Sequence, residues 1–215
     1  MNTHFRNAVL VQLQSKALGS STVQDRLHFR AGQTLECPSA NAPQIVLPQL
    51  GVLLLQNTEG GKSVDVGLLG AANGLVVPMS TRMTWRMQAL REGWAHVFQL
   101  PADAMVSSAD VLLKVQQRLL EQVAIWGYCR QHHALPQRLA TLLMVLCDDA
   151  GEWDWSAWSG LLNVNASFLQ AGLQALEKVE AVTLRANRVT IQQADLLKRQ
   201  TCSCLGRLKT LTTGD

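Results

Sequence analysis

Short apolar runs alternate with polar, glycine-containing segments between residues 27 and 100. Runs of this length and spacing are typical of the strands in an antiparallel barrel or jelly roll. We expect strands at residues 29–35, 44–47, 51–55, 63–69 and 94–100, with a tight hairpin turn at residues 59–62. No ten-residue stretch of this region has sustained helical periodicity, so an N-terminal β domain is predicted.

A long amphipathic helix is predicted to follow. Ser107 or Ser108 is placed to cap it, and Asp110 stands in its first turn. Apolar residues then recur at steps of three and four, at Leu112, Val115, Leu119, Val123, Trp126 and Cys129. A stripe of this length exceeds what a small barrel covers, which favours pairing with a second copy in coiled-coil fashion. The expected dimer contacts are Leu112, Val115, Leu119 and Trp126; the alternative is that the stripe packs only on its own barrel.

The C-terminal region has the pattern of two capped helices followed by a hairpin. Pro136 opens a first helix over residues 137–147. Asp154 is placed to cap a short helix, and Asn165 to cap a second one, each with apolar residues at helical spacing. The β-prone runs at residues 181–184 and 188–191 predict a small hairpin. This order of elements is typical of a winged helix-turn-helix, although two helices and a hairpin also occur in many other α+β domains.

These elements predict an α+β protein with three parts. Residues 1–106 would form a β-barrel sensor domain, residues 107–135 a dimerisation helix, and residues 136–215 a winged helix-turn-helix domain. A chain of 215 residues has room for two modest domains, each able to bury a core.

Composition supports a globular protein, with 47% hydrophobic and 16% charged residues. The apolar runs are too short to cross a bilayer, and residues 1–10 lack a secretory pattern, so a cytoplasmic protein without a membrane partner is expected. The net charge is +3, but residues 136–215 hold eight basic and eight acidic residues. A segment that grips phosphates normally has a basic excess, so this balance argues against tight DNA binding.

Three further segments resemble one bacterial family. They are residues 87–95 (MQALREGWA), residues 129–140 (CRQHHALPQRLA), and the region of residues 185–204 that ends in Cys202-Ser203-Cys204. In this order they resemble a proteobacterial branch of the Crp/Fnr superfamily of transcription regulators, over about residues 27–204. The resemblance implies a cyclic-nucleotide-binding-like β jelly roll, a long dimerisation helix and a C-terminal winged helix-turn-helix. It also implies a homodimer that binds double-stranded DNA, with RNA polymerase or another regulator as a further candidate partner.

The chain departs from the family's cyclic-nucleotide cassette. Relatives that bind cyclic nucleotide carry a Gly-Glu pair for the ribose and an Arg followed by Ser or Thr for the phosphate. Here Gly74 is followed by Leu75 and Val76, and no such Arg pair occurs downstream. Without a carboxylate and a phosphate clamp the pocket lacks its strongest polar contacts, so cyclic AMP is not the expected effector. The candidates for another effector pocket are Gly74, Arg82, Thr84 and Arg86. The alternative is that Arg82 and Arg86 are solvated charges at the edge of a strand.

No cofactor or metal is expected. The first cysteine is Cys37, so the N-terminal cysteine group of iron–sulfur relatives is absent. Cys202 and Cys204 have no His or Cys close to them in sequence, and a tetrahedral metal site needs more than two ligands. The five cysteines are odd in number and scattered, which does not indicate a disulfide framework. No catalytic motif is present, so the protein is not expected to be an enzyme.

The first turn of the second predicted helix departs from the family as well. Relatives usually place an Arg with a Glu, or two Arg, where this chain has Ala166 and its neighbours. Ala166 cannot hydrogen-bond to a base edge, and Ser167 discriminates poorly. The candidate DNA contacts are therefore Asn165, Ser167, Gln170, Gln174, Arg185 and Arg188.

Two hypotheses remain. The first is a homodimeric regulator that binds DNA through the winged helix-turn-helix, with an effector other than cyclic AMP or none. The second is a diverged relative that has lost specific DNA binding and acts as a protein-interaction module. The neutral C-terminal charge and the Arg-free recognition turn favour the second, whereas the resemblance in fold to the family favours the first.

Overall fold

The computed structural model describes residues 24–37, 43–77, 84–100, 106–146 and 152–213. The chain divides into two compact units. Unit 1 comprises Met1–Gln122 with Thr210–Asp215, and unit 2 comprises Val123–Lys209. The boundary lies inside helix α3 (Ala109–His132), so one part of this helix belongs to unit 1 and the other to unit 2.

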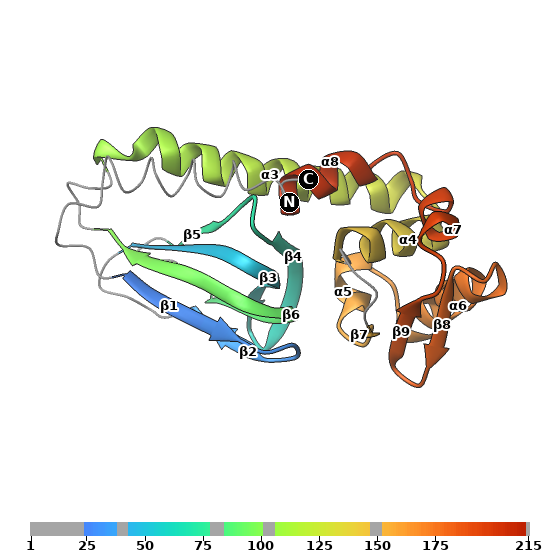
Figure 1. The fold of residues 1–215 in the computed structure, drawn as a ribbon. Coiled ribbons are helices and arrows are strands. Elements are labelled where there is room, and N and C mark those ends of the chain that lie inside the picture. The colour runs from blue at the N-terminus through green and yellow to red at the C-terminus, as the bar shows by residue number, and fades with distance from the viewer. Residues whose placement is uncertain (1–23, 38–42, 78–83, 101–105, 147–151, 214–215) are drawn as a thin grey trace. The chain divides into compact units, whose positions relative to one another are not determined.

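Unit 1 is built on an antiparallel sheet (Figure 1). Its strands are β1 (Gln24–Phe29), β2 (Thr34–Glu36), β3 (Gln44–Glu59), β4 (Lys62–Leu69), β5 (Leu75–Val77) and β6 (Thr84–Gln99). The order is β1-β6-β3-β4, with β2 also paired to β6 and β5 to β3. A β-rich antiparallel N-terminal region is thus confirmed, and the finer assignment as a jelly roll stays a prediction.

Glycines explain where the strands differ from expectation. The expected strand at residues 29–35 is wrong: it is broken by a turn in which Gly32 has a φ of +82° and Gln33 N donates to Arg30 O. The two expected strands at residues 44–47 and 51–55 are one strand, because Gly51, with a φ of +84°, lets β3 bend without ending. The hairpin turn at residues 59–62 is confirmed, with Glu59 paired to Lys62.

The first half of α3 packs on the sheet of its own unit. Val111, Leu112 and Val115 form a core cluster with apolar residues of β3 and β6, and Leu119 is buried one turn further on. Trp126, in the part of α3 that belongs to unit 2, is fully buried too. The four residues expected at a dimer interface therefore lie in the interior of the protomer, because the protomer itself already covers the stripe that the pattern identified.

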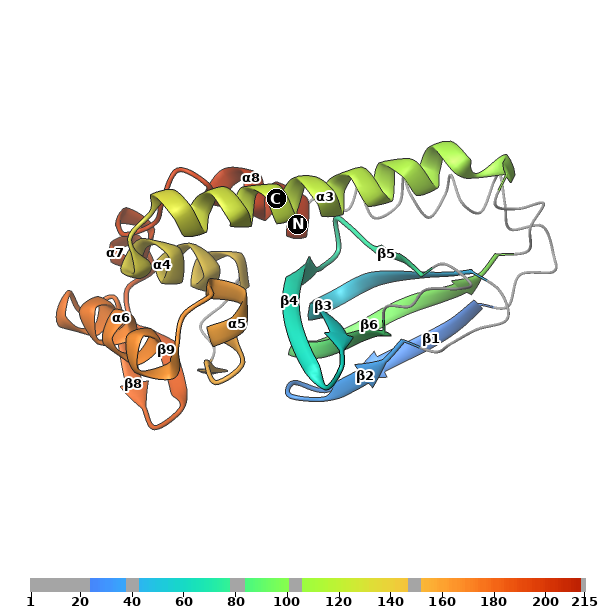
Figure 2. The same cartoon turned by 180° about the vertical axis from the view of Figure 1, so that it is seen from behind.

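Unit 2 is mainly helical, with one small sheet (Figure 2). Its helices after α3 are α4 (Leu135–Leu146), α5 (Trp158–Leu162), α6 (Ala166–Lys178) and α7 (Ala194–Arg199), and α8 (Leu205–Thr212) begins in this unit. The sheet has the antiparallel order β7-β9-β8, from β7 (Glu152–Asp154), β8 (Val182–Arg185) and β9 (Arg188–Ile191). Among the described helices of the whole chain, none has the length and apolarity that a membrane span requires.

Candidate nucleic-acid interface

The turn between α5 and α6 is closed by backbone and side-chain hydrogen bonds. Asn163 ends α5 in the left-handed conformation, with a φ of 52°, and its N–H donates to Gly160 O. Two residues later, Asn165 begins α6, and its Oδ1 accepts a hydrogen bond of 2.9 Å from Phe168 N. The predicted Asn165 cap is therefore confirmed, and α5 and α6 are two helices joined by a short turn.

The predicted Asp154 cap is wrong. Asp154 belongs to β7, and its Oδ1 accepts from Ser156 N at 2.9 Å in a local turn. Helix α5 starts after Ala157, which makes no side-chain cap. Strand β7 contains the residue that was expected to cap the helix, since Asp154 pairs with Arg188 of the hairpin.

Two arginines hold the end of α5. Arg138 of α4 donates to Leu162 O at 2.9 Å, and Arg130 of α3 donates to Leu161 O at 3.3 Å. The last carbonyls of a helix lack partners within the helix and carry its negative dipole end, so cations are favoured there. Helix α6 packs closely against α4 in the same unit. A Cβ added at Gly172 of α6 would lie only 2.6 Å from the Leu139 side chain of α4. These contacts fix where the first turn of α6 lies.

Every candidate DNA contact of the sequence is on the surface. Asn165, Ser167, Gln170 and Gln174 are exposed on α6, and Arg185 and Arg188 are exposed at the facing ends of the hairpin strands. Leu169, Leu173 and Leu176 of α6 are buried, which leaves the polar side of the helix to solvent. The N–H groups at the start of a helix favour anions such as phosphate.

The hairpin is tied to helix α6 through one of its strands and to strand β7 through the other. Leu184 N of β8 donates to Glu177 Oε1 of α6 at 2.8 Å. Arg188 of β9 forms an ion pair of 3.3 Å with Glu152 of β7, and both side chains are about half exposed. An exposed ion pair of this kind is weak, so it competes little with binding of Arg188 to another anion. Arg185 has no side-chain partner among the described residues, and its backbone pairs with that of Arg188.

Phe168 is the residue that the sequence reasoning missed. It lies in the first turn of α6 with 65% of its surface exposed, which is unusual for a large apolar side chain. The helical pattern contained the signal, because Phe168 stands immediately before Leu169 and cannot share the buried stripe with it. An aromatic ring beside a helix N-terminus fits contact with a thymine methyl group or with an apolar protein surface.

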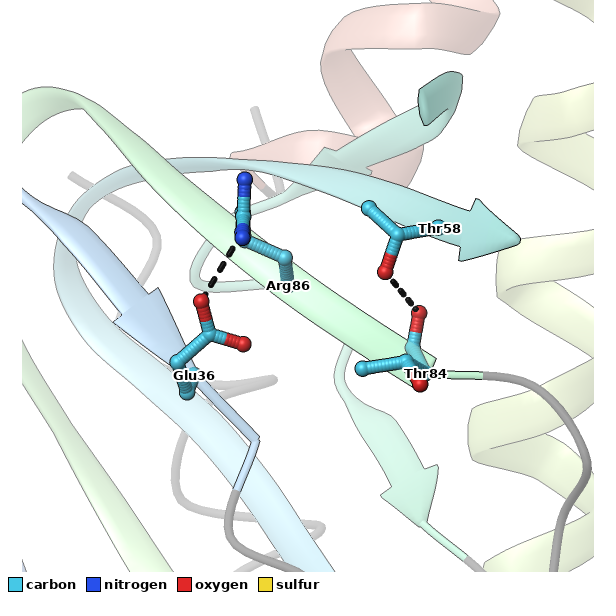
Figure 3. A network of polar contacts seen from close by, with 4 residues as sticks. All are labelled: Glu36, Thr58, Thr84 and Arg86. Atoms are coloured by element: carbon cyan, nitrogen blue, oxygen red, sulfur yellow. Dashed lines mark hydrogen bonds and ion pairs between the residues drawn. The ribbon is translucent and has the colours of Figure 1, made fainter. Parts of the chain in front are cut away.

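Three of the four candidates for an effector pocket, Gly74, Thr84 and Arg86, lie among the described residues of unit 1. Gly74 is packed so tightly that a Cβ there would lie 2.8 Å from Val46 O. Figure 3 shows Arg86 paired with Glu36 at 3.0 Å, while Thr84 accepts a hydrogen bond from Thr58 through its carbonyl oxygen. Arg82 lies outside the described residues. The ordinary explanation of Arg86, a charge at the edge of a strand, agrees with its pairing.

A cavity of about 520 Å³ lies elsewhere in unit 1, between β1, β2, β3 and β6. Its lining includes Arg26, Thr34, Glu36, Gln44 and Met87. Gln44 is buried, and its Oε1 has no hydrogen-bond partner among the described residues.

Unit 2 also brings together side chains that are far apart in the sequence. Cys129, His133, Cys202 and Cys204 have ligand atoms that all lie within 4.8 Å of one another. Sequence spacing could not reveal this group, because Cys129 and Cys202 are 73 positions apart. His132, its neighbour, instead stacks on Tyr128, with ring centroids 4.4 Å apart.

Comparison with known proteins supports the fold. No family model matches the chain, and no curated protein sequence matches it. Among solved structures, a CRP/FNR-family transcriptional regulator from Thermus thermophilus is similar at 12% identity and a TM-score of 0.61, over 82% of this chain and 97% of that one. FixK2 from Bradyrhizobium japonicum is similar at 12% identity and a TM-score of 0.57, over 84% of this chain and 98% of that one.

A second CRP-family transcriptional regulator from Thermus thermophilus has 13% identity and a TM-score of 0.59, over 81% of this chain and 95% of that one. At such low identities the similarity is one of fold. The chain has the fold of CRP/FNR transcriptional regulators along most of its length, with a strongly diverged sequence.

Proposed function

We propose that this protein is a diverged CRP/FNR-type transcription regulator that binds double-stranded DNA as a homodimer through a winged helix-turn-helix. The role is regulatory, not catalytic. The observation that carries the proposal is the exposed first turn of α6, which is capped by Asn165 and flanked by a hairpin with Arg185 and Arg188 at its end. The chain's likeness in fold to regulators of this family supports the same assignment.

The chemistry of α6 favours A·T base pairs in the major groove. Gln170 and Gln174 are one turn apart, and a glutamine amide matches the N6 and N7 groups of adenine. Phe168 and Ala166 offer apolar contact to a thymine methyl group. The helix has no basic residue before Lys178, so phosphate contacts fall to the hairpin arginines and to the N–H groups of the first turn.

The dimer contact is proposed on the outward face of α3. Leu113 and Leu120 are 61% and 66% exposed, and seven positions separate them, so they lie on one side of the helix. This side is turned by about a third of a turn of the helix from the side of Leu112, Val115 and Leu119, which are buried in unit 1. Two copies that pair through it would present two recognition helices to two DNA half-sites.

The effector, if the regulator has one, is proposed to be a molecule other than cyclic AMP. The side chains that would touch a Cβ at Gly74 are apolar, and Arg86 is already paired with Glu36. The cavity lined by Arg26, Glu36 and Gln44 is the better place for such a molecule.

A second function is supported by one observation. Phe168 exposes an aromatic ring where a DNA reader normally presents polar groups, and this favours an apolar protein partner such as another regulator or RNA polymerase. The two functions differ in their dependence on salt. The logarithm of DNA affinity falls linearly with the logarithm of salt concentration, whereas an apolar contact lacks this dependence.

The test is the affinity of the full chain for mixed-sequence duplex DNA, measured by fluorescence anisotropy over a series of salt concentrations. The proposal expects binding at low salt that falls steeply as salt is added. Failure to bind any duplex at the lowest salt would reject DNA binding and leave the protein-interaction function.

A further inference from the structure

Three thiols and an imidazole meet in unit 2, and we call Cys129, His133, Cys202 and Cys204 the thiol–imidazole cluster. Two of them come from the end of α3: Cys129 is in its last turn, and His133 follows its final residue, so they are one helical turn apart. The other two lie in the connection between α7 and α8. The three sulfur-bearing side chains are buried and the imidazole is partly buried.

The distances inside the cluster are those of a tetrahedral ion site. Cys129 Sγ lies 3.5 Å from Cys202 Sγ, and Cys204 Sγ lies 3.7 Å from His133 Nδ1. Four ligands at zinc bond lengths of about 2.3 Å to sulfur and about 2.0 Å to nitrogen would stand about 3.5–3.8 Å from one another. The cluster needs only small side-chain movements to meet this geometry, since its largest separation is within 4.8 Å.

Helix α4 holds the connection between α7 and α8, which carries Cys202 and Cys204. Cys202 N donates to Thr141 Oγ1 of α4 at 3.0 Å, and the same hydroxyl lies 3.1 Å from Cys202 Sγ. Hydrogen bonds to the atoms around a metal orient its ligands, and Thr141 is fully buried. The support comes from a helix that is not itself part of the cluster, as expected of a preformed site.

We propose that the thiol–imidazole cluster is a structural zinc site. Three thiolates and one imidazole favour Zn²⁺ over Mg²⁺ or Ca²⁺, which prefer oxygen ligands. Four protein ligands fill the coordination shell, so the ion has no open position for catalysis. The site would join the end of α3 to the connection between α7 and α8, which are about seventy residues apart along the chain.

The proposal departs from the expectation, from sequence, that the chain holds no metal. Cys202 and Cys204 lack partners in their own segment, and a Cys-x-Cys pair alone is too small a ligand set. Folding supplies the two missing ligands, from a helix that the sequence pattern assigned to dimerisation.

The test measures metal in the purified full chain by mass spectrometry, after growth with added zinc. We expect about one zinc per chain, as a four-ligand structural site binds tightly. Cys202→Ser and Cys129→Ser should each lose most of the zinc. Cys37→Ser is the matched control and should keep it, because Cys37 belongs to unit 1.

Because a cysteine variant can fail to fold, the unmodified chain is also stripped of metal and titrated with Co²⁺. The proposal expects saturation at one equivalent, the intense visible bands of tetrahedral cobalt with thiolate ligands, and a raised unfolding midpoint on metal addition. Absence of zinc together with absence of these bands would overturn it. So would a Cys129–Cys202 disulfide in the native protein, or iron in place of zinc. DNA binding is measured independently, so failure of the zinc site leaves the proposed function intact.

Discussion

Arg138 donates from its guanidinium to the carbonyl oxygen of Leu162 across 2.9 Å, which joins α4 to the last turn of α5. Burial lowers the pKa of Arg138, although the group stays charged at neutral pH. The contact lies at the base of the turn that leads into α6. It couples the stability of unit 2 to the position of the proposed recognition helix.

Replacing Arg138 with Met should therefore destabilise unit 2. The change keeps an apolar stem but leaves the Leu162 carbonyl without its charged donor, at a cost of about 1.5–3 kcal/mol in the free energy of unfolding. Urea unfolding followed by circular dichroism measures it. Lys198→Met, at an exposed position of α7, is the control and should change stability by less than about 0.5 kcal/mol. Equal losses in the two variants would contradict this role of Arg138.

The two hairpin arginines should differ in their effect on DNA affinity. Arg185→Ala is expected to lower affinity for all duplexes alike and to reduce the salt dependence by about one unit of slope. Arg188→Ala should have a smaller effect, because Arg188 already pairs with Glu152. Glu152→Gln should strengthen binding, since it removes a negative charge and releases Arg188. Anisotropy titrations at several salt concentrations give these slopes; an unchanged slope for Arg185→Ala would exclude it as a phosphate contact.

Sequence patterns predicted the elements of unit 2 well. The Asn165 cap and the two β-prone runs of the hairpin are local features, set by residues within a few positions of one another. The strand β7 was missed because its pairing with β9 depends on residues more than thirty positions away. The sequence could therefore predict features set by local pattern, and it could not predict those set by long-range strand pairing.

The apolar stripe on α3 shows what helical periodicity can predict and what it leaves open. Periodicity correctly identified Leu112, Val115 and Leu119 as one apolar face, but it cannot tell a protomer's own sheet from a second helix as the covering surface. The sequence could not reveal the thiol–imidazole cluster either, because only folding brings Cys202 to the end of α3.

Dimerisation should depend on the outward face of α3. A double change of Leu113 and Leu120 to Glu places like charges in the proposed contact and should give folded monomers. Leu119→Glu should instead unfold unit 1, because that side chain is buried. Sedimentation velocity and circular dichroism separate the two results. The contact is misplaced if the double variant sediments as the unmodified chain does.

His96 should make the stability of unit 1 depend on pH. Burial, with the nearby charge of Arg26 adding to it, lowers the pKa of this imidazole below its usual value of 6.5. The unfolded chain then binds a proton more readily than the folded one, so stability falls as the pH drops through about 6.5. The urea midpoint of the unmodified chain should decrease between about pH 7.5 and 5.5, and His96→Gln should decrease less. Parallel decreases would assign the effect to other groups.

The central claim is that α6 reads DNA sequence, and repeated selection from a randomised duplex library tests it most directly. The full chain should enrich a two-part site whose halves are about one helical turn apart, with A·T pairs where α6 lies. Gln170→Ala should relax the preference at one position of each half-site by about 1–3 kcal/mol. A pool that stays random after selection, with the unmodified chain folded and dimeric, would contradict sequence reading by this helix.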